Sequence, residues 1–169
     1  MPDQTFDEFV HAALPALSRY AYALTGERAA ADDLIQDTLV KVAGAWRRVH
    51  RDGSPLAYAR TTMLNTYLSA WRIRRRRPVS VPMEVDWPSP DAYGPVDVRD
   101  QLRRALDALP RAQRAVLVLG FLDDLSDEEI AAMLDRRPAT VRSLRHRGLA
   151  ALRRQLDSDQ VEGGPYARR

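Results

Sequence analysis

The sequence predicts an all-α protein in which two small helical domains are joined by a flexible linker. Apolar residues recur at helical spacing in several stretches on either side of residues 78–97. Five prolines fall in that segment, and no stable helix tolerates prolines at such spacing. The chain is 45% hydrophobic but only 7% aromatic, which supplies a helical core without the aromatic excess typical of a sheet protein.

The first predicted helix begins at Phe6. Thr5 and Glu8 form the pattern of a capping box at its start, and Thr25–Gly26 ends it. One apolar stripe runs along the segment: Phe6, Phe9, Val10, Ala13, Leu17, Tyr20 and Leu24. This pattern predicts a helix with one buried face.

Two more helices complete the first domain. The second carries the stripe Leu34, Ile35, Thr38, Leu39, Val42, Trp46 and Val49, and the residues HRDGSP end it. Ser54 caps the third helix, with Pro55 in its first turn. Its stripe is Leu56, Ala59, Met63, Leu64, Tyr67, Leu68 and Trp71. It leads directly into a run of four arginines: Arg74, Arg75, Arg76 and Arg77.

The proline-rich segment also sets the predicted domain boundaries. It contains acids but no base between Pro78 and Pro95, as expected for an extended linker. We therefore divide the chain into a first domain at 5–77, a linker at 78–97, a second domain at 98–156 and a disordered tail at 157–169.

The second domain begins with two helices that meet at Pro110. The first has the stripe Val98, Leu102, Ala105, Leu106 and Leu109, and the second has Val116, Leu117 and Leu119. Proline ends the one because it cannot continue a helix, and its fixed φ suits the start of the next.

Residues 126–147 predict a helix-turn-helix. Ser126 and Glu129 form a second capping box, and the acids of the first turn suit the positive end of the helix dipole. Asp135–Arg137 is a brief turn, and Pro138 opens the next helix. Asp135 stands where such turns usually have glycine, and aspartate tolerates the left-handed conformation better than most residues. Ala131 is small enough for a close crossing, with Val141 and Leu144 as the matching apolar residues.

A helical wheel gives the second of these helices a polar face. Arg142, Ser143, His146 and Arg147 share it. Arg145 lies nearer the buried side, so its stem is expected to pack while its head reaches solvent. Arginine reads guanine in the major groove, and the seven arginines between Arg136 and Arg154 are accompanied by no acid. We favour DNA binding over the alternative of a solvated face.

Composition argues against several other classes of protein. There is no cysteine, and His11, His50 and His146 are scattered without metal-ligand spacing, so we predict no catalytic residue, no metal site and no cofactor. The start of the chain lacks the pattern of a secretory signal, and no run of about 18 apolar residues could span a membrane. We expect a cytoplasmic protein that is not an enzyme.

Three stretches resemble, in order and spacing, the extracytoplasmic-function sigma factors of bacteria, and most closely the actinobacterial branch. They are ADDLIQDTLVKVAGAW, SPLAYARTTMLNTYLSAWRIRRRR and ALDALPRAQRAVLVLGFLDDLSDEEIAAMLDRRPATVRSLRHRGLAALRR. The resemblance implies a sigma region 2 and a sigma region 4 that bind core RNA polymerase and promoter DNA. Many relatives are held inactive by an anti-sigma factor, which makes such a protein a candidate partner.

The resemblance also assigns roles to residues. Asp33, Gln36 and Asp37 match the positions that bind core polymerase, although the family more often has Glu in place of Asp37. The downstream (−10) element is matched by Arg60, Asn65, Arg74, Arg75, Arg76 and Arg77. The upstream (−35) element is matched by Arg142, Ser143, His146 and Arg147, the set that the helical wheel identifies independently.

Two alternatives remain at this stage. A stand-alone helix-turn-helix regulator would dimerise and bind an operator without polymerase, but the sequence offers no evident dimerisation helix. Trp46 and Trp71 could stack on bases, but both lie on apolar stripes, so we favour core packing for them.

Overall fold

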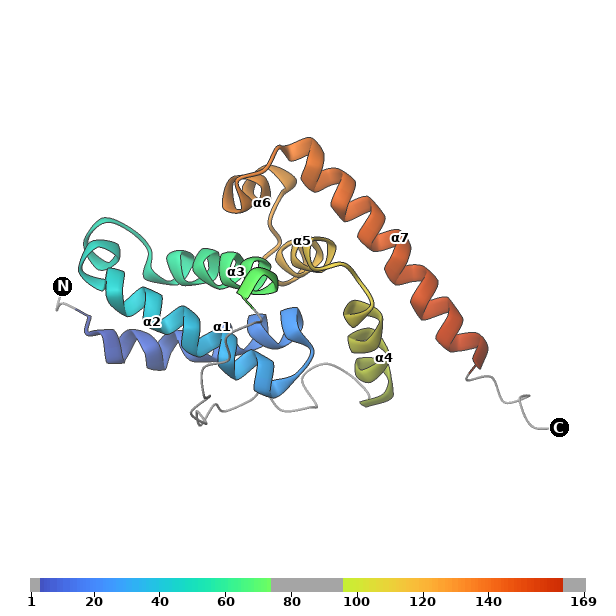
Figure 1. The fold of residues 1–169 in the computed structure, drawn as a ribbon, viewed down its shortest axis with the longest axis horizontal. Coiled ribbons are helices and arrows are strands. Elements are labelled where there is room, and N and C mark those ends of the chain that lie inside the picture. The colour runs from blue at the N-terminus through green and yellow to red at the C-terminus, as the bar shows by residue number, and fades with distance from the viewer. Residues whose placement is uncertain (1–3, 74–95, 163–169) are drawn as a thin grey trace. The chain divides into compact units, whose positions relative to one another are not determined.

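The computed structural model describes residues 4–73 and 96–162, and all seven helices in these ranges are α-helices with no strand among them (Figure 1). The chain divides into two compact units, Met1–Pro88 and Ser89–Arg169. The first unit contains α1 (Phe6–Thr25), α2 (Arg28–Asp52) and α3 (Pro55–Ile73). The second contains α4 (Val96–Asp107), α5 (Arg111–Leu122), α6 (Asp127–Leu134) and α7 (Pro138–Glu162). The predicted all-α class is confirmed.

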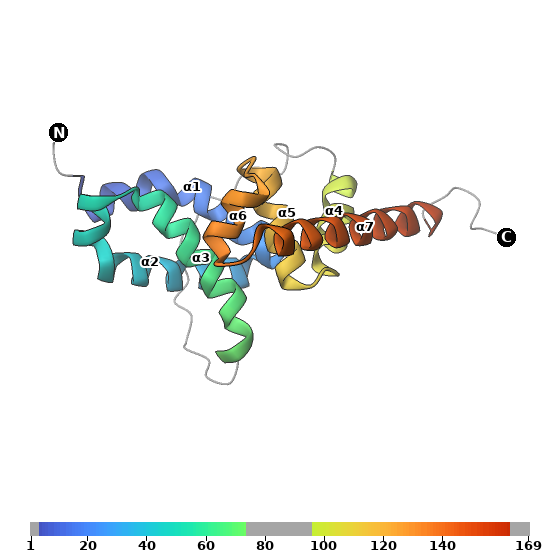
Figure 2. The same ribbon diagram turned by 90° about the horizontal axis from the view of Figure 1, so that it is seen from above.

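The first unit is a three-helix bundle. α2 packs against both α1 and α3, and the two views of the ribbon agree on this arrangement (Figures 1 and 2). Its largest fully buried side chains come from all three predicted stripes: Leu17, Leu24, Ile35, Thr38, Val42, Met63 and Leu64. The Thr38 hydroxyl donates to the Leu34 carbonyl oxygen at 2.7 Å, so this polar group enters the core with a hydrogen bond.

The ends of α1 follow the sequence prediction. Thr5 Oγ1 accepts from the Glu8 N–H at 3.3 Å, and the Glu8 carboxylate accepts from the Thr5 N–H at 2.8 Å. Gly26 ends the helix with φ 72°, a left-handed conformation that costs glycine little.

Trp46 packs in an aromatic cluster, as predicted. Its ring centroid lies 5.3 Å from that of Phe6 and 5.2 Å from that of Phe9, and it stacks on His50 at 5.1 Å. The cluster joins α1 to the later half of α2. The side chain of Trp71 lies outside the described side chains.

The second unit is built on α7, against which α4, α5 and α6 all pack (Figure 1). Ala105, Leu109, Val116, Leu117 and Leu119 are buried, as the stripes predict. Val98 and Leu102 belong to the same stripe but are 55% and 42% exposed. Periodicity identifies an apolar face, but it does not reveal how much of that face a neighbouring helix covers.

The predicted disordered tail at 157–169 is wrong for its first part. α7 continues to Glu162, because no glycine or proline interrupts the helix before Gly163. Gln101 Nε2 donates to the Leu156 carbonyl oxygen at 3.4 Å and ties this end of α7 to α4. The predicted linker at 78–97 is likewise too long by two residues, since α4 begins at Val96. Residues 78–95 and 163–169 lie outside the described residues.

A buried arginine, which the sequence analysis did not identify, fixes the connection between α4 and α5. Arg114 is only 6% exposed. Its Nε donates to the Leu106 carbonyl oxygen at 2.7 Å, and its Nη2 lies 2.8 Å from an Asp107 carboxylate oxygen. The charge is therefore paired and hydrogen-bonded at the end of α4, where a cation also suits the helix dipole.

The turn between α6 and α7 has the predicted form. Ser126 Oγ accepts from the Glu129 N–H at 3.2 Å, and Glu129 Oε2 accepts from both the N–H and the hydroxyl of Ser126 at 2.8 Å. Asp135 ends α6 with φ 50° and ψ 53°. Ala131 is 2% exposed and Val141 is fully buried, as expected for a close crossing.

Substituting Ser126 tests the capping box. Ser126→Ala should lower the free energy of unfolding of the second unit by about 1 kcal/mol, because it removes the side-chain acceptor of the Glu129 N–H. Urea unfolding followed by far-UV circular dichroism would measure the change, and Ser158→Ala, near the end of α7, is the control. All three tryptophans precede residue 89, so their fluorescence midpoint should stay constant. An equal loss in both variants would contradict the assignment.

Glu129 should make the stability of the second unit depend on pH. The hydrogen bonds from Ser126 hold the pKa of this exposed carboxyl below its ordinary value of 4.5. Because the pKa is lower in the folded state, the stabilisation is present above pH 4.5 and is lost as pH falls through the folded-state pKa. The melting temperature of Glu129→Gln should therefore decline less than that of the parent protein between pH 6 and pH 3. Parallel declines would refute this role.

Candidate nucleic-acid and polymerase interfaces

The polar face predicted for the start of α7 lies on the outside of the second unit. Arg142, Ser143, His146 and Arg147 are all exposed, while Val141 is fully buried on the opposite side. Burial of Val141 orients the helix, so all four polar side chains are left exposed to solvent. The structure thus brings together on one surface all four residues that the sequence nominates for the upstream element.

Two members of this face contact each other. Arg147 Nη2 donates to Ser143 Oγ at 3.0 Å, and its Nε donates to the Ser143 carbonyl oxygen at 3.4 Å. These bonds fold the arginine back along its own helix. A hydrogen bond to a neutral hydroxyl is weaker than one to a charged acceptor. Arg147 can therefore exchange Ser143 for a charged or bidentate acceptor.

Arg142 lies between two carboxylates of α6. Its Nε is 3.7 Å from an Asp127 oxygen and its Nη2 is 3.6 Å from a Glu128 oxygen, while 66% of its side chain is exposed. Ion pairs of such an exposed side chain contribute about 0–1 kcal/mol, so a competing anion can displace them at small cost. The acids of α6 therefore do more than initiate the helix, which is the only role the sequence analysis gave them.

The expectation that the head of Arg145 reaches solvent is wrong. Arg145 Nε donates to an Asp127 oxygen at 2.7 Å, and Nη2 donates to the Leu125 carbonyl oxygen at 3.1 Å. Its side chain is 25% exposed. The wheel places Arg145 correctly on the inner side of α7, but the partners that hold it there come from a different part of the chain.

The acidic surface of α2 lies in the first unit. Asp33 and Asp37 are exposed and Gln36 is half-buried, whereas the intervening Leu34 and Ile35 are buried. The three residues nominated for polymerase binding therefore share the outer side of α2. A protein surface with matching donors could reach them without unfolding the bundle.

Asp32 is a neighbour of this surface that the sequence analysis did not identify. Its Oδ1 is buried and, among the described residues, accepts no hydrogen bond. Burial raises the pKa of this carboxyl, and the Asp33 charge raises it further, while Arg28 opposes both effects. The burial of this carboxyl beside a candidate interface can be recognised only once the fold is known.

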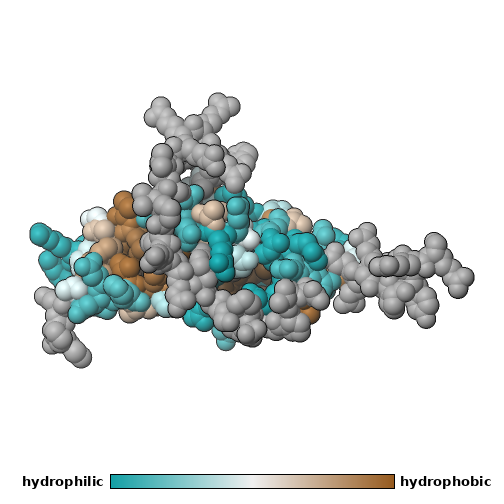
Figure 3. Space-filling view, turned by 90° about the horizontal axis from the view of Figure 1, so that it is seen from below, coloured by the Kyte–Doolittle hydropathy of each residue, from teal (hydrophilic) through white to brown (hydrophobic). Residues whose placement is uncertain are grey.

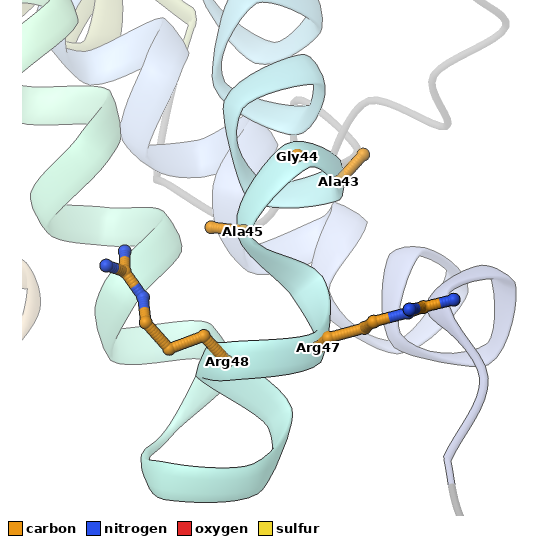
Figure 4. A pocket seen from close by; sticks show the side chains of 5 residues that line it. All are labelled: Ala43, Gly44, Ala45, Arg47 and Arg48. Carbon is orange, nitrogen blue, oxygen red and sulfur yellow. The ribbon is translucent and has the colours of Figure 1, made fainter.

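Past Asp37 the exposed side of α2 changes in character. Val40 is 73% exposed, and an open depression of about 500 Å³ is lined, among the described residues, by Ala43, Gly44, Ala45, Arg47 and Arg48. Arg47 and Arg48 leave the helix on opposite sides (Figure 4). Hydrophobic residues also gather over part of the first unit on the face shown in Figure 3. The outer side of α2 thus runs from acids through small apolar residues to arginines.

The residues nominated for the downstream element lie on α3 or beyond it. Asn65 is exposed, and Arg60 is half-buried with its Cζ 5.4 Å from the centre of the Tyr20 ring. The next residue, Thr66, accepts from Lys41 Nζ at 2.7 Å, which ties α2 to α3 beside Asn65. Arg74, Arg75, Arg76 and Arg77 lie outside the described residues.

Neither a membrane-spanning helix nor a metal-binding cluster is present among residues 4–73 and 96–162. No helix in these ranges is both long and apolar enough to cross a membrane. Nor do the described histidine and acidic side chains gather into a group of three or more that could hold a metal ion.

The chain is similar to known proteins over both of its units. The family model for sigma-70 region 2 matches residues 9–77, and the model for sigma-70 region 4 matches residues 99–152. The RNA polymerase sigma-E factor of Streptomyces coelicolor is 35% identical over 151 residues, which are 89% of this chain and 85% of the relative. The extracytoplasmic-function sigma factor SigL of Mycobacterium tuberculosis is 34% identical over 160 residues, covering 89% and 86%.

A solved structure is also similar. It is the sigma factor RpoE in complex with the anti-sigma factor NepR from Bartonella quintana, with a TM-score of 0.69 and 27% identity over 91% of this chain and 98% of that one. Sequence and structure therefore agree over nearly the whole length of these relatives. The chain belongs to the extracytoplasmic-function sigma factors of the sigma-70 family, the RNA polymerase subunits that direct transcription to particular promoters.

Proposed function

We propose that this sigma factor divides its work between its two units. The first, residues 5–77, binds core RNA polymerase and the downstream element, and the second, residues 98–156, binds the upstream element. The observation that supports this proposal is that α2 carries exposed acids, Asp33 and Asp37, while the start of α7 carries an exposed set with two arginines. Residues 78–95, which precede α4, would join the two.

In the first unit, we assign core polymerase binding to Asp33, Gln36 and Asp37. Two carboxylates and an amide can accept or exchange hydrogen bonds with a basic or polar helix surface. Val40 and the depression beside Gly44 come next along α2 and would extend the contact.

Downstream-element binding would use α3 and the arginine run that follows it in the sequence. We assign it to Arg60, Asn65, Arg74, Arg75, Arg76 and Arg77. Asn65 can both donate to and accept from a base edge, while the arginine run suits phosphates, which give salt-dependent affinity without sequence preference.

In the second unit, we assign upstream-element binding to Arg142, Ser143, His146 and Arg147. An exposed helix start with two arginines suits the major groove, where arginine pairs with guanine. Such a subunit acts by binding, so we assign it no catalytic residue and no cofactor, and we expect it to work in the cytoplasm with its polymerase. A separate anti-sigma factor is a further candidate partner, because the similar RpoE structure contains one.

Binding to purified core RNA polymerase tests the proposal directly. Size-exclusion chromatography at moderate salt should show the protein co-eluting with core enzyme, and the complex should initiate from specific sites on genomic DNA where core alone does not. A folded protein that fails to co-elute, yet protects specific DNA sites by itself, would instead support a stand-alone helix-turn-helix regulator.

A further inference from the structure

Arg145 joins three helices through one guanidinium group. It starts from α7, donates to Asp127 at the first position of α6, and donates to the Leu125 carbonyl oxygen in the segment between α5 and α6. The 2.7 Å contact with Asp127 is a short, charge-assisted bond. Asp127 is itself only 18% exposed, so solvent screens the pair less than it would a surface ion pair.

The third helix, α5, contributes Gly120, whose lack of a side chain leaves room for the guanidinium. A Cβ atom built on Gly120 of α5 would lie 2.4 Å from Arg145 Nη1, 3.0 Å from Cζ and 3.1 Å from Nη2. The guanidinium therefore lies directly over the backbone of Gly120. Any larger residue at this position would have to displace it.

The same carboxylate that holds Arg145 also faces the DNA-reading surface. One Asp127 oxygen binds Arg145 Nε at 2.7 Å, and the other lies 3.7 Å from Arg142 Nε. Arg145 lies about one helical turn from Arg142 and two residues from Arg147. Its guanidinium, unlike theirs, is held against α6 and the segment before it. This contact therefore links the reading face of α7 to α6.

We infer that Arg145, clamped by Asp127 and the Leu125 carbonyl over Gly120, is a positioning residue that sets which bases the exposed face of α7 prefers. This inference rests on the proposed upstream-element role of α7. Bidentate base contacts tolerate only small errors in distance and angle. A small rotation of α7 on α6 would therefore change base preference before it abolished affinity, because phosphate contacts are less demanding in geometry.

The test uses the full-length protein with core RNA polymerase. The template is a promoter selected with the parent protein, with its downstream element fixed and its upstream element randomised. Each upstream variant carries its own barcode in the transcribed region, and sequencing these barcodes in the transcripts gives the preference at each upstream position. Arg145→Met keeps the stem but removes the guanidinium, Asp127→Asn weakens its partner, and Arg145→Lys restores a cation without the planar fork. Arg104→Met, on an exposed position of α4, is the matched control.

We expect Arg145→Met and Asp127→Asn to reduce discrimination between the best and second-best base about tenfold at one or more upstream positions, the scale of one good base contact. Arg145→Lys should restore part of it, and Arg104→Met should match the parent. Gly120→Ala would ordinarily favour a helix, yet here it should act like Arg145→Met. The double variant Gly120→Ala/Arg145→Met should lose no more discrimination than either single one, because both act on the same contact.

Two results separate the possible failures. If the variants keep the parent base preference and change only the melting temperature, Arg145 is merely structural and the inference is overturned. If the parent protein itself directs no promoter-specific transcription, the proposed function fails instead. Should Arg145→Met leave the second unit unfolded by circular dichroism, Arg145→Lys and Gly120→Ala decide the question by the same readout.

Discussion

Arg147→Ala should reduce transcription from a cognate promoter by about tenfold to a hundredfold, the effect of losing one bidentate base contact. Arg147 is exposed on α7 and its bonds to Ser143 stay within one helix, so its removal should leave the fold intact. Run-off transcription with reconstituted polymerase would measure the loss, and co-elution with core enzyme should be unchanged.

The matched control for this prediction is Arg104→Ala. It removes the same charge from an exposed position of the second unit, but from α4 rather than from the reading face. If both variants lose activity equally, the effect is one of general charge and not of base contact. If Arg147→Ala loses core binding instead, the division of work between the two units is wrong.

Gln36→Ala should have the opposite result, with weaker binding to core polymerase and unchanged recognition of the upstream element. Gln36 lies on the outer side of α2 between two exposed aspartates, near the centre of the nominated surface. Truncation of a central interface residue costs about 2 kcal/mol, which corresponds to a roughly thirtyfold loss of affinity. Titration of fluorescently labelled protein with core enzyme would measure it.

Gln4→Ala is the control for this second prediction. It removes the same amide from an exposed position in the first unit, before α1. Its affinity for core enzyme should equal that of the parent protein. An unchanged affinity in Gln36→Ala would show that polymerase binds elsewhere, with the later part of α2, around Val40 and Arg47, as the next surface to substitute.

The sequence determined the local structure of this protein because local signals act between residues close in the chain. Thr5 with Glu8 and Ser126 with Glu129 cap their helices as predicted, and Gly26 and Asp135 take the left-handed conformation at their ends. The exposed set on α7 followed in the same way, since a helix of known start places every fourth residue on one side. The motif order, matched to a known family, then supplied the function.

Tertiary structure alone decided which side chains from distant parts of the chain meet. Arg145 binds Asp127, eighteen residues away, and its guanidinium lies against Gly120 of α5. Arg114 donates to the Leu106 carbonyl oxygen near the end of α4. The same limit explains why Val98 and Leu102 remain exposed although they lie on an apolar stripe. Helical periodicity assigns a residue to a face, but its partner depends on how several helices pack, and that packing is not encoded in any single stretch of sequence.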